Sequence, residues 1–219
     1  MLLDLVLPQR CVVCGTGGAQ LCVACSEALP RLRGPCCDRC GAPTAWPVSW
    51  CRECSGRRLA FASARAAVAY DAAVRALVRA WKERGLRRLA SAAAVIVAEA
   101  LPRPDEAALA FVPPDGDRSL RRGHHPPERL ARELARHWEL PVAPLLRRAR
   151  PLRRQRGLPL RERRRNVAGA FRASGRSPPR IVLVDDVYTT GATAAAAASA
   201  LRKAGARRVD VVTFARAVR

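Results

Sequence analysis

Short apolar runs alternate along the chain with longer segments in which apolar residues recur every three or four positions. The run Ile181–Val184 is uninterrupted and rich in β-branched residues, which is typical of a strand buried on both faces of a parallel sheet. The segment 74–81 repeats apolar residues at helical spacing after Asp71, a residue type that favours a helix N-cap. This alternation predicts an α/β fold, an open and mostly parallel doubly wound sheet with helices on both faces. The expected strands are 60–70, 108–112, 181–184 and 209–214, and the expected helices are 71–85, 88–101, 126–137 and the alanine-rich segment that ends at Gly205.

Acidic and hydroxyl-bearing residues follow the apolar run 181–184 directly. Asp185 and Asp186 come first, and the alanine-rich helix begins after a short loop. A loop at a helix N-terminus offers unpaired backbone N–H groups and the positive end of the helix dipole, so it is suited to phosphate. Carboxylates beside it would repel a bare anion, but they suit the vicinal hydroxyls of a sugar or a divalent metal. The order predicts a ribose 5-phosphate site, with an ordinary capped strand–turn–helix as the alternative. The predicted phosphate-binding residues are Thr189, Thr190, Gly191, Ala192 and Thr193.

All nine cysteines lie in the first 58 residues. Eight of them form four CxxC pairs, and two such pairs can complete a tetrahedral zinc site of four thiolates. In a reducing compartment this clustering favours metal ligands over disulfides, and four pairs together argue against a redox CxxC. We therefore predict one or two structural zinc ions; sequential and interleaved pairing both remain open, as does the role of Cys36. The predicted ligands are Cys11, Cys14, Cys22, Cys25, Cys37, Cys40, Cys51 and Cys54.

The character of the sequence changes near residue 58, where the cysteines end. We therefore expect two domains, a double zinc ribbon over residues 1–58 and the α/β domain over residues 59–219. Forty Lys and Arg against eighteen acidic residues give a net charge of +22, which favours polyanionic partners such as nucleic acid, nucleotides or pyrophosphate. The first eight residues lack a basic leader and no apolar run reaches the length of a membrane span, so we expect a cytoplasmic protein.

Polar loops follow the expected strand 108–112. The segment 113–117 leads into Arg121 and Arg122, which we place on the same rim of the sheet as Asp185, because ligand loops lie beyond the carboxyl ends of parallel strands.

Two further polar stretches have a less specific pattern. His124 and His125 are expected to be exposed loop residues without a ligand role. The segment Arg147–Arg176 holds twelve arginines and one acidic residue. It is either a solvated loop or a flap whose guanidinium groups close over pyrophosphate.

The sequence VLVDDVYTTGAT resembles the motif by which type I phosphoribosyltransferases bind phosphoribosyl pyrophosphate (PRPP). By that resemblance Asp185 and Asp186 hold the ribose 2- and 3-hydroxyls, and residues 189–193 cradle the 5-phosphate. Nearly the whole chain resembles the ComF/GntX family of competence-associated proteins, in which a cysteine-rich zinc ribbon is fused to a phosphoribosyltransferase domain. The smaller matching elements are Tyr70, Lys82-x-x-Gly85, Arg121-Arg122-Gly123, Gln155, Arg164-x-Asn166 and Ala170-Phe171. The chain departs from the family at His124-His125-Pro126, where Phe-Asn-Gln is usual.

The resemblance implies an enzyme that binds PRPP, or a related ribose phosphate, with Mg²⁺ and transfers the phosphoribosyl group to a nitrogen acceptor, in DNA uptake and competence or in nucleotide salvage. Asp185 and Asp186 would stabilise positive charge on the ribose as pyrophosphate leaves. The alternative is a non-catalytic adaptor whose zinc ribbon and arginines bind single-stranded DNA or a DNA-processing protein. The cations expected to balance the leaving group are Lys82, Arg121, Arg122 and Arg164.

Overall fold

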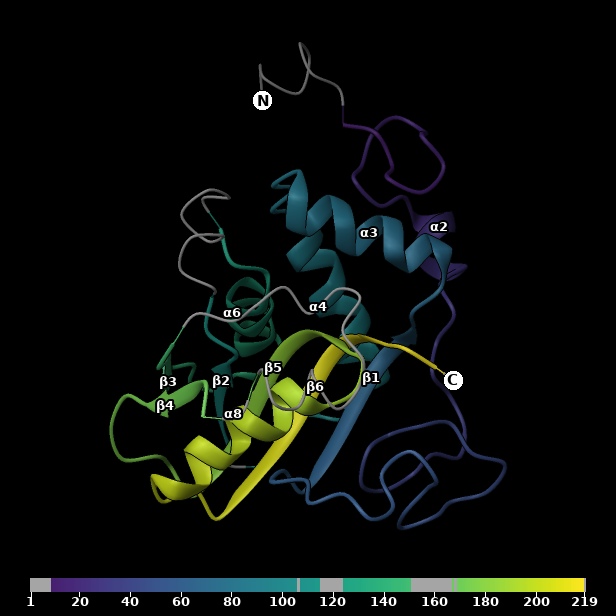
Figure 1. Cartoon of the computed structure of the whole chain (residues 1–219). Coiled ribbons are helices and arrows are strands. Elements are labelled where there is room, and N and C mark those ends of the chain that lie inside the picture. Colours follow the sequence, from purple (N-terminus) through teal and green to yellow (C-terminus); the bar gives the residue numbers. More distant parts are fainter. Residues whose placement is uncertain (1–8, 106, 115–123, 151–166, 168, 219) are drawn as a thin grey trace.

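The computed structural model of the protein describes residues 9–105, 107–114, 124–150, 167 and 169–218 (Figure 1). Its centre is a four-stranded sheet in the order β1-β6-β5-β2, in which every neighbouring pair is parallel. The parallel α/β class predicted from the hydrophobic pattern is therefore confirmed. The strands are β1 (Ser63–Ala69), β2 (Ala108–Phe111), β5 (Arg180–Tyr188) and β6 (Arg208–Arg216).

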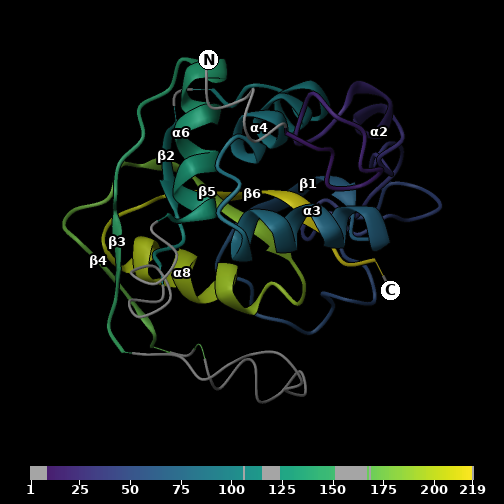
Figure 2. The same cartoon turned by 90° about the horizontal axis from the view of Figure 1, so that it is seen from above.

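Helices cover both faces of this sheet, as Figure 2 shows from above. Helices α4 (Leu89–Ala100) and α6 (Pro126–Trp138) pack on one face, and α8 (Ala192–Lys203) packs on the other. Helix α3 (Ala72–Glu83) shares the core of α4 and lies above the end of the sheet where the strands finish (Figure 1). The Asp71 carboxylate caps it by accepting a hydrogen bond of 2.8 Å from the Val74 backbone N–H, as its N-cap position predicts. Within the described residues, no helix is both long and apolar enough to cross a bilayer.

Strand β5 is longer than the apolar run predicts, because it continues through Tyr188. Asp185 and Asp186 therefore lie inside a strand rather than in a loop. Side chains alternate between the two faces of a strand, so the adjacent acids differ: Asp186 is buried and Asp185 is half-buried. Pairing with β6 fixes their depth, since Asp185 is opposite Thr213 and Tyr188 is opposite Arg216.

The arginine-rich segment has regular structure at both of its ends. Strand β3 (Leu146–Arg148) pairs antiparallel with β4 (Phe171–Ala173) in a second, two-stranded sheet. The sequence predicts only loops here, because arginines and prolines conceal the short apolar positions Leu146 and Phe171, which are buried. The flap predicted between these strands lies mostly outside the described residues.

The cysteine-rich segment lies along the β1 edge of the sheet and reaches both of its faces. We call residues 9–28 the first ribbon, with the short helix α2 (Val23–Glu27), and residues 35–57 the second ribbon. The link between them pairs with β1, because Leu32 N–H donates to Ala67 O and Ala69 N–H donates to Pro30 O. These bonds occupy backbone groups that an open edge strand would leave unpaired.

The two ribbons pack into different cores. Val12 and Leu21 of the first ribbon contact the core beneath α3 and α4. Cys37, Cys40 and Cys54 of the second ribbon are buried in the core on the α8 side of the sheet. The sheet therefore holds the double ribbon from both faces.

Gly41 sets how closely the second ribbon approaches β1. It has φ of +69°, and a Cβ at this position would lie 2.3 Å from the carbonyl oxygen of Ala64. Gly56 has nearly the same φ, +68°, with nothing within 4 Å. The Gly56→Ala change should lower the free energy of unfolding by about 1–2 kcal/mol through backbone strain alone. The Gly41→Ala change should cost roughly 1–3 kcal/mol more, because the ribbon must move off the strand. Urea unfolding of the zinc-loaded variants measures both; equal losses would contradict the close packing.

Candidate functional site

Three of the predicted catalytic residues meet at the end of the sheet where the strands finish. Lys82 comes from the last turn of α3, and its Nζ lies 2.6 Å from Oδ2 of Asp186. Burial lowers the pKa of Lys82, but the charge of Asp186, its hydrogen bond to Lys82 and the charge of Asp185 together contribute to outweighing burial and raise that pKa above its ordinary value. Lys82 is therefore a cation at neutral pH and neutralises Asp186.

Asp185 has a different environment, although it is adjacent to Asp186 in the sequence. Burial and the neighbouring Asp186 charge raise the pKa of Asp185 to about 7, despite the opposing effect of Lys82. Its Oδ1 accepts a hydrogen bond of 2.9 Å from the Asp186 backbone N–H. One carboxylate of the pair is thus ion-paired and the other is partly protonated at neutral pH, so the pair repels an anionic ligand less than two free carboxylates would.

Residues 189–193, the predicted phosphate-binding segment that we call the phosphate loop, join this acidic pair to the first turn of α8. The fold of this loop depends on Gly191, the N-cap of the helix, which has φ of +68°. A Cβ at Gly191 would lie 2.2 Å from Oη of Tyr188, so a side chain is excluded there for two reasons. Thr190 is buried, and its Oγ1 accepts a hydrogen bond of 3.3 Å from Ala192 N–H. The twelve-residue helix begins at Ala192, so the first-turn N–H groups and the helix dipole point into this loop.

His124 and His125 correct the expectation of exposed loop histidines. His124 is only 7% exposed, and its Nε2 lies 2.7 Å from Trp81 O. His125 is half-buried, with Nε2 2.6 Å from Val112 O. A carbonyl only accepts hydrogen bonds, so both Nε2 atoms carry the hydrogen. Both rings tie the start of α6 to neighbouring elements, a tertiary role that a polar pair before two prolines does not reveal.

His125 and Arg148 both interact electrostatically with the acidic pair. Burial lowers the pKa of His125, and the hydrogen bond to Val112 and the charge of Asp186 only partly offset burial. The Arg148 guanidinium donates to Pro113 O and Pro114 O at 3.1 and 2.8 Å, and it opposes the raised pKa of Asp185. No local pattern distinguishes Arg148 from the other arginines of its segment.

The other predicted cations are not placed. Arg121, Arg122 and Arg164 lie outside the described residues. Asp185, Asp186, Lys82 and the phosphate loop are the predicted site residues that the described part of the chain brings together.

The eight paired cysteines form two separate groups in sequential order. Within each group the sulfur atoms all lie within 4.8 Å of one another. Zinc bound about 2.3 Å from four tetrahedral thiolates separates the sulfurs by about 3.8 Å. The observed separations are 3.7 Å for Cys14–Cys22, 3.5 Å for Cys37–Cys54 and 3.4 Å for Cys40–Cys51.

Two four-cysteine sites therefore fit structural zinc. Burial raises the pKa of Cys11, but hydrogen bonds from the backbone N–H groups of Cys14, Cys22 and Val13 and from the Cys14 side chain together outweigh burial and lower that pKa to about 6, which favours the thiolate that zinc requires. Cys36 belongs to neither group. All four ligands in each group are protein thiolates, so these sites hold structure rather than offer an open position for catalysis.

The raised pKa of Asp185 predicts a pH-dependent stability. Between the unfolded value of 3.8 and about 7 the folded state holds a proton that the unfolded state releases, so stability falls as pH rises. The free energy of unfolding of the wild type, relative to Asp185→Asn, should fall by about 2 kcal/mol between pH 5.5 and 7.5. Urea titrations with saturating zinc at both pH values measure this difference. A difference that stays constant or grows with pH would contradict the buried, partly protonated acid.

Comparisons with known proteins agree with this architecture. Residues 2–55 match the double zinc ribbon domain family. The chain is 28% identical to competence protein F of Haemophilus influenzae over 209 residues, which span 90% of both chains. It is 30% identical to DNA utilization protein YhgH of Salmonella typhi over 226 residues, 94% of this chain and 96% of the relative. The corresponding YhgH of Escherichia coli O157:H7 is 28% identical over 228 residues. The chain therefore belongs to the family of competence protein F and DNA utilization protein YhgH, as its motifs predicted.

Proposed function

We propose that the chain binds PRPP, or a related ribose 5-phosphate, at the carboxyl end of β5 and transfers its phosphoribosyl group to a nitrogen acceptor. The observation that carries this proposal is the juxtaposition of an acidic pair with a helix N-terminus on one strand–loop–helix unit. The phosphate loop would take the 5-phosphate, and Asp185 and Asp186 would take the ribose hydroxyls.

The charges of the site support an anionic sugar ligand. Lys82 neutralises Asp186 at 2.6 Å, and burial keeps Asp185 partly protonated near pH 7. A protonated carboxyl can donate a hydrogen bond to a hydroxyl, whereas a carboxylate can only accept one. The pair can therefore hold two adjacent hydroxyls without the full repulsion of two negative charges.

The reaction moves charge in a way that this arrangement suits. The bond between the ribose C1 and the pyrophosphate oxygen breaks with its electron pair going to pyrophosphate, and a nitrogen lone pair forms the new bond to C1. Positive charge develops on the ribose ring between these events. The ionised carboxylate of Asp186 stabilises it, and Asp185 adds to this effect in the fraction that is ionised. Mg²⁺ that arrives with PRPP would offset the charge of the leaving group, and carboxylate oxygens are ligands that it accepts.

Removing either acid should weaken ligand binding. Asp185→Asn and Asp186→Asn should each raise the Kd for PRPP, measured by calorimetry with Mg²⁺, by roughly tenfold or more, because hydrogen bonds to charged groups contribute about 1.5–3 kcal/mol. Asp210→Asn is the matched control. Asp210 is also a strand carboxylate, but it lies near the opposite end of the sheet, where it contacts Arg208 and Ser63. Equal affinity in all four proteins would reject the site, and release of pyrophosphate with a panel of nucleobases would separate transferase from sensor.

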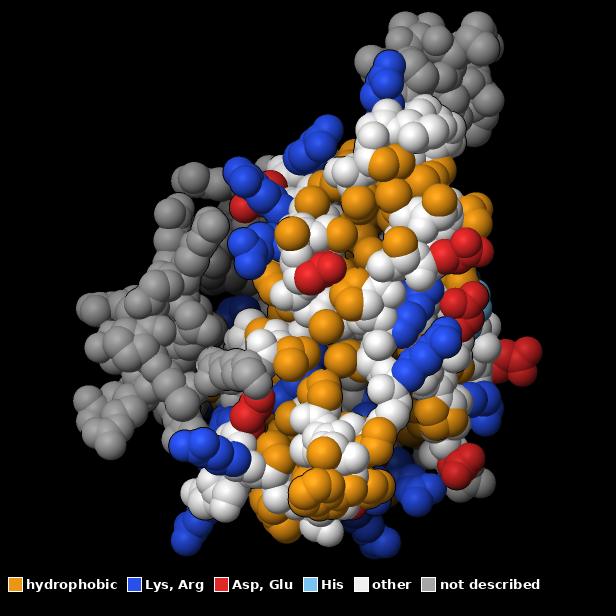
Figure 3. Space-filling view, turned by 90° about the vertical axis from the view of Figure 1, so that its right-hand side faces the viewer, with side chains coloured by type: hydrophobic (Ala, Val, Ile, Leu, Met, Phe, Trp, Pro, Cys, Tyr) orange, Lys and Arg blue, Asp and Glu red, His pale blue; other side chains and the backbone are white. Residues whose placement is uncertain are grey.

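A second candidate function is binding of single-stranded DNA through the second ribbon. The relatives are named for competence and for DNA utilization. Trp46 and Trp50 of this ribbon are 68% and 53% exposed. Arg39 lies over the Trp50 ring at 5.1 Å and donates to Leu59 O and Ala62 O, which hold it in place. Exposed rings beside cations suit base stacking with phosphate contacts. Figure 3 shows hydrophobic side chains interspersed with Lys and Arg on the face of the molecule that carries the ribbons.

This second function predicts a loss of DNA affinity when the rings are removed. Trp46→Ala and Trp50→Ala should each weaken binding of a single-stranded oligonucleotide by about 1–3 kcal/mol, and affinity should fall steeply with added salt. Fluorescence anisotropy of a labelled oligonucleotide measures both. Val23→Ala in the first ribbon is the control, because Val23 is 73% exposed and apolar but has no ring. Binding that is unchanged in both tryptophan variants would exclude this surface.

A further inference from the structure

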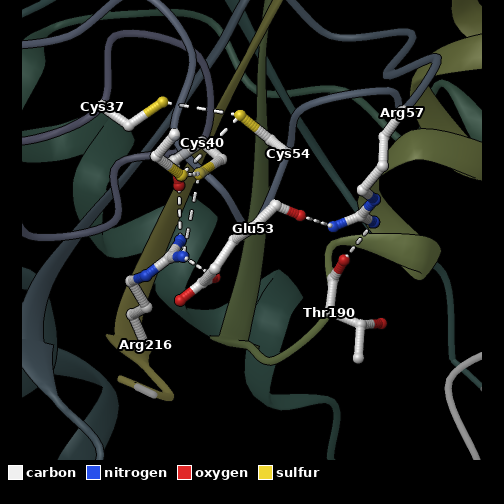
Figure 4. Close-up of polar contacts among 8 residues, drawn as sticks. Cys37, Cys40, Glu53, Cys54, Arg57, Thr190 and Arg216 are labelled. Carbon is white, nitrogen blue, oxygen red and sulfur yellow. Dashed lines mark hydrogen bonds and ion pairs between the residues drawn. The ribbon is translucent and has the colours of Figure 1, made fainter.

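Arg57 joins the second zinc ribbon to the phosphate loop (Figure 4). It lies three residues after the zinc-site residue Cys54, and its backbone N–H donates to the Cys54 carbonyl. Its guanidinium donates one hydrogen bond of 3.2 Å to Glu53 O and a second one to Thr190 O, 133 positions away in the sequence. A single side chain therefore contacts both the zinc knuckle and the loop.

The bond to Thr190 O fixes more than one atom. The peptide between Thr190 and Gly191 is trans, since the described residues contain no cis peptide bond. In a trans peptide the C=O and the following N–H point in opposite directions. By holding the Thr190 carbonyl toward the ribbon, Arg57 directs the Gly191 N–H away from it. The orientation of this loop donor thus depends on the ribbon.

Arg216 supports the other end of the loop. It is the last residue of β6 and is 1% exposed. Its guanidinium donates to Cys40 O, lies 2.6 Å from Oε2 of Glu53, and lies 4.7 Å from the centre of the Tyr188 ring. That ring packs against Gly191, where no Cβ fits. The phosphate loop is therefore contacted by Arg57, which belongs to the second ribbon, and by the Tyr188 ring, which packs on Arg216, a residue that the second ribbon holds.

The first ribbon provides an internal contrast. Val12 and Leu21 pack into the core on the opposite face of the sheet, beneath α3 and α4. Zinc in the first ribbon would stabilise that packing, whereas zinc in the second ribbon would stabilise the knuckle that carries Glu53 and Arg57.

We infer that the second zinc ribbon positions the phosphate loop, with Arg57 as the positioning residue, and that zinc in this ribbon and a phosphorylated ligand in the loop bind cooperatively. The inference has two halves. The loop half, that Arg57 positions the phosphate loop, does not depend on the proposed function; the ligand half, that zinc and ligand bind cooperatively, rests on it. Coupling between two binding sites is reciprocal, so the ligand must strengthen zinc binding in the second ribbon by the factor by which zinc strengthens ligand binding. We expect this gain in zinc affinity to show as slower zinc loss.

The loop half is tested by hydrogen–deuterium exchange of the zinc-loaded protein without ligand. In Arg57→Ala the backbone amides of residues 190–195 should exchange at least about fivefold faster than in the wild type, because the opening that exposes them costs less free energy. Arg57→Lys, which retains a charged donor, should recover part of the protection. Arg58→Ala is the matched control, since Arg58 is the neighbouring arginine and is exposed. Loop exchange that is equal in wild type and Arg57→Ala overturns the inference.

The ligand half is tested by PRPP affinity and by zinc release to a chelator. Arg57→Ala should bind PRPP with Mg²⁺ roughly tenfold more weakly, the factor expected for one charge-assisted hydrogen bond, and Arg58→Ala should bind normally. The wild type should release zinc in two phases, and PRPP should slow one of them. In Arg57→Ala, PRPP should slow neither phase. A purely structural role for Arg57 would not create this ligand-dependent difference.

The outcomes separate the two proposals. PRPP that binds the wild type but slows neither zinc phase rejects the coupling and leaves the proposed function standing. A wild type that does not bind PRPP, together with a loop that Arg57→Ala loosens, rejects the proposed function and supports the positioning role.

Discussion

The buried guanidinium of Arg216 makes the contacts that hold together three parts of the molecule: the end of β6, the second ribbon and the phosphate loop. A charge that is 1% exposed is costly unless acceptors surround it. Its acceptors come from the second ribbon, at Cys40 O and Glu53, and its flat face lies on Tyr188 before the phosphate loop. The strand end, the ribbon and the loop must therefore form together. This requirement explains why a zinc domain of few large apolar residues packs so closely on the sheet.

The acidic pair shows how one strand produces two chemical environments. Alternation along β5 buries Asp186 beside Lys82 and leaves Asp185 half-buried with a pKa raised to about 7 by burial and by its neighbour. The same two residue types thus supply one fixed carboxylate and one that exchanges its proton near neutral pH. Such a division suits a ligand whose hydroxyls need both donors and acceptors.

Local signals in the sequence were sufficient for most of the fold and for part of the site. The β-branched run 181–184, the Asp71 cap and the CxxC spacing act over a few residues, so each could be predicted without the structure. Contacts such as Arg57 with Thr190 and Arg216 with Cys40, 133 and 176 positions apart, leave no local pattern among forty basic residues. The prediction that His124 and His125 are exposed is wrong for the same reason: their carbonyl partners belong to other elements, and the polarity of the two residues indicates exposure.

The pairing of residues 30–32 with β1 also limits how the chain can be divided for expression. A fragment that begins at the sheet would lose the backbone partners of Ala67 and Ala69, and its outer strand would offer free N–H and C=O groups to other molecules. The same cut would leave the Arg216 guanidinium without Cys40 and Glu53. An isolated sheet fragment would be inclined to associate through that strand, so recombinant work is better served by retaining both metal-binding modules.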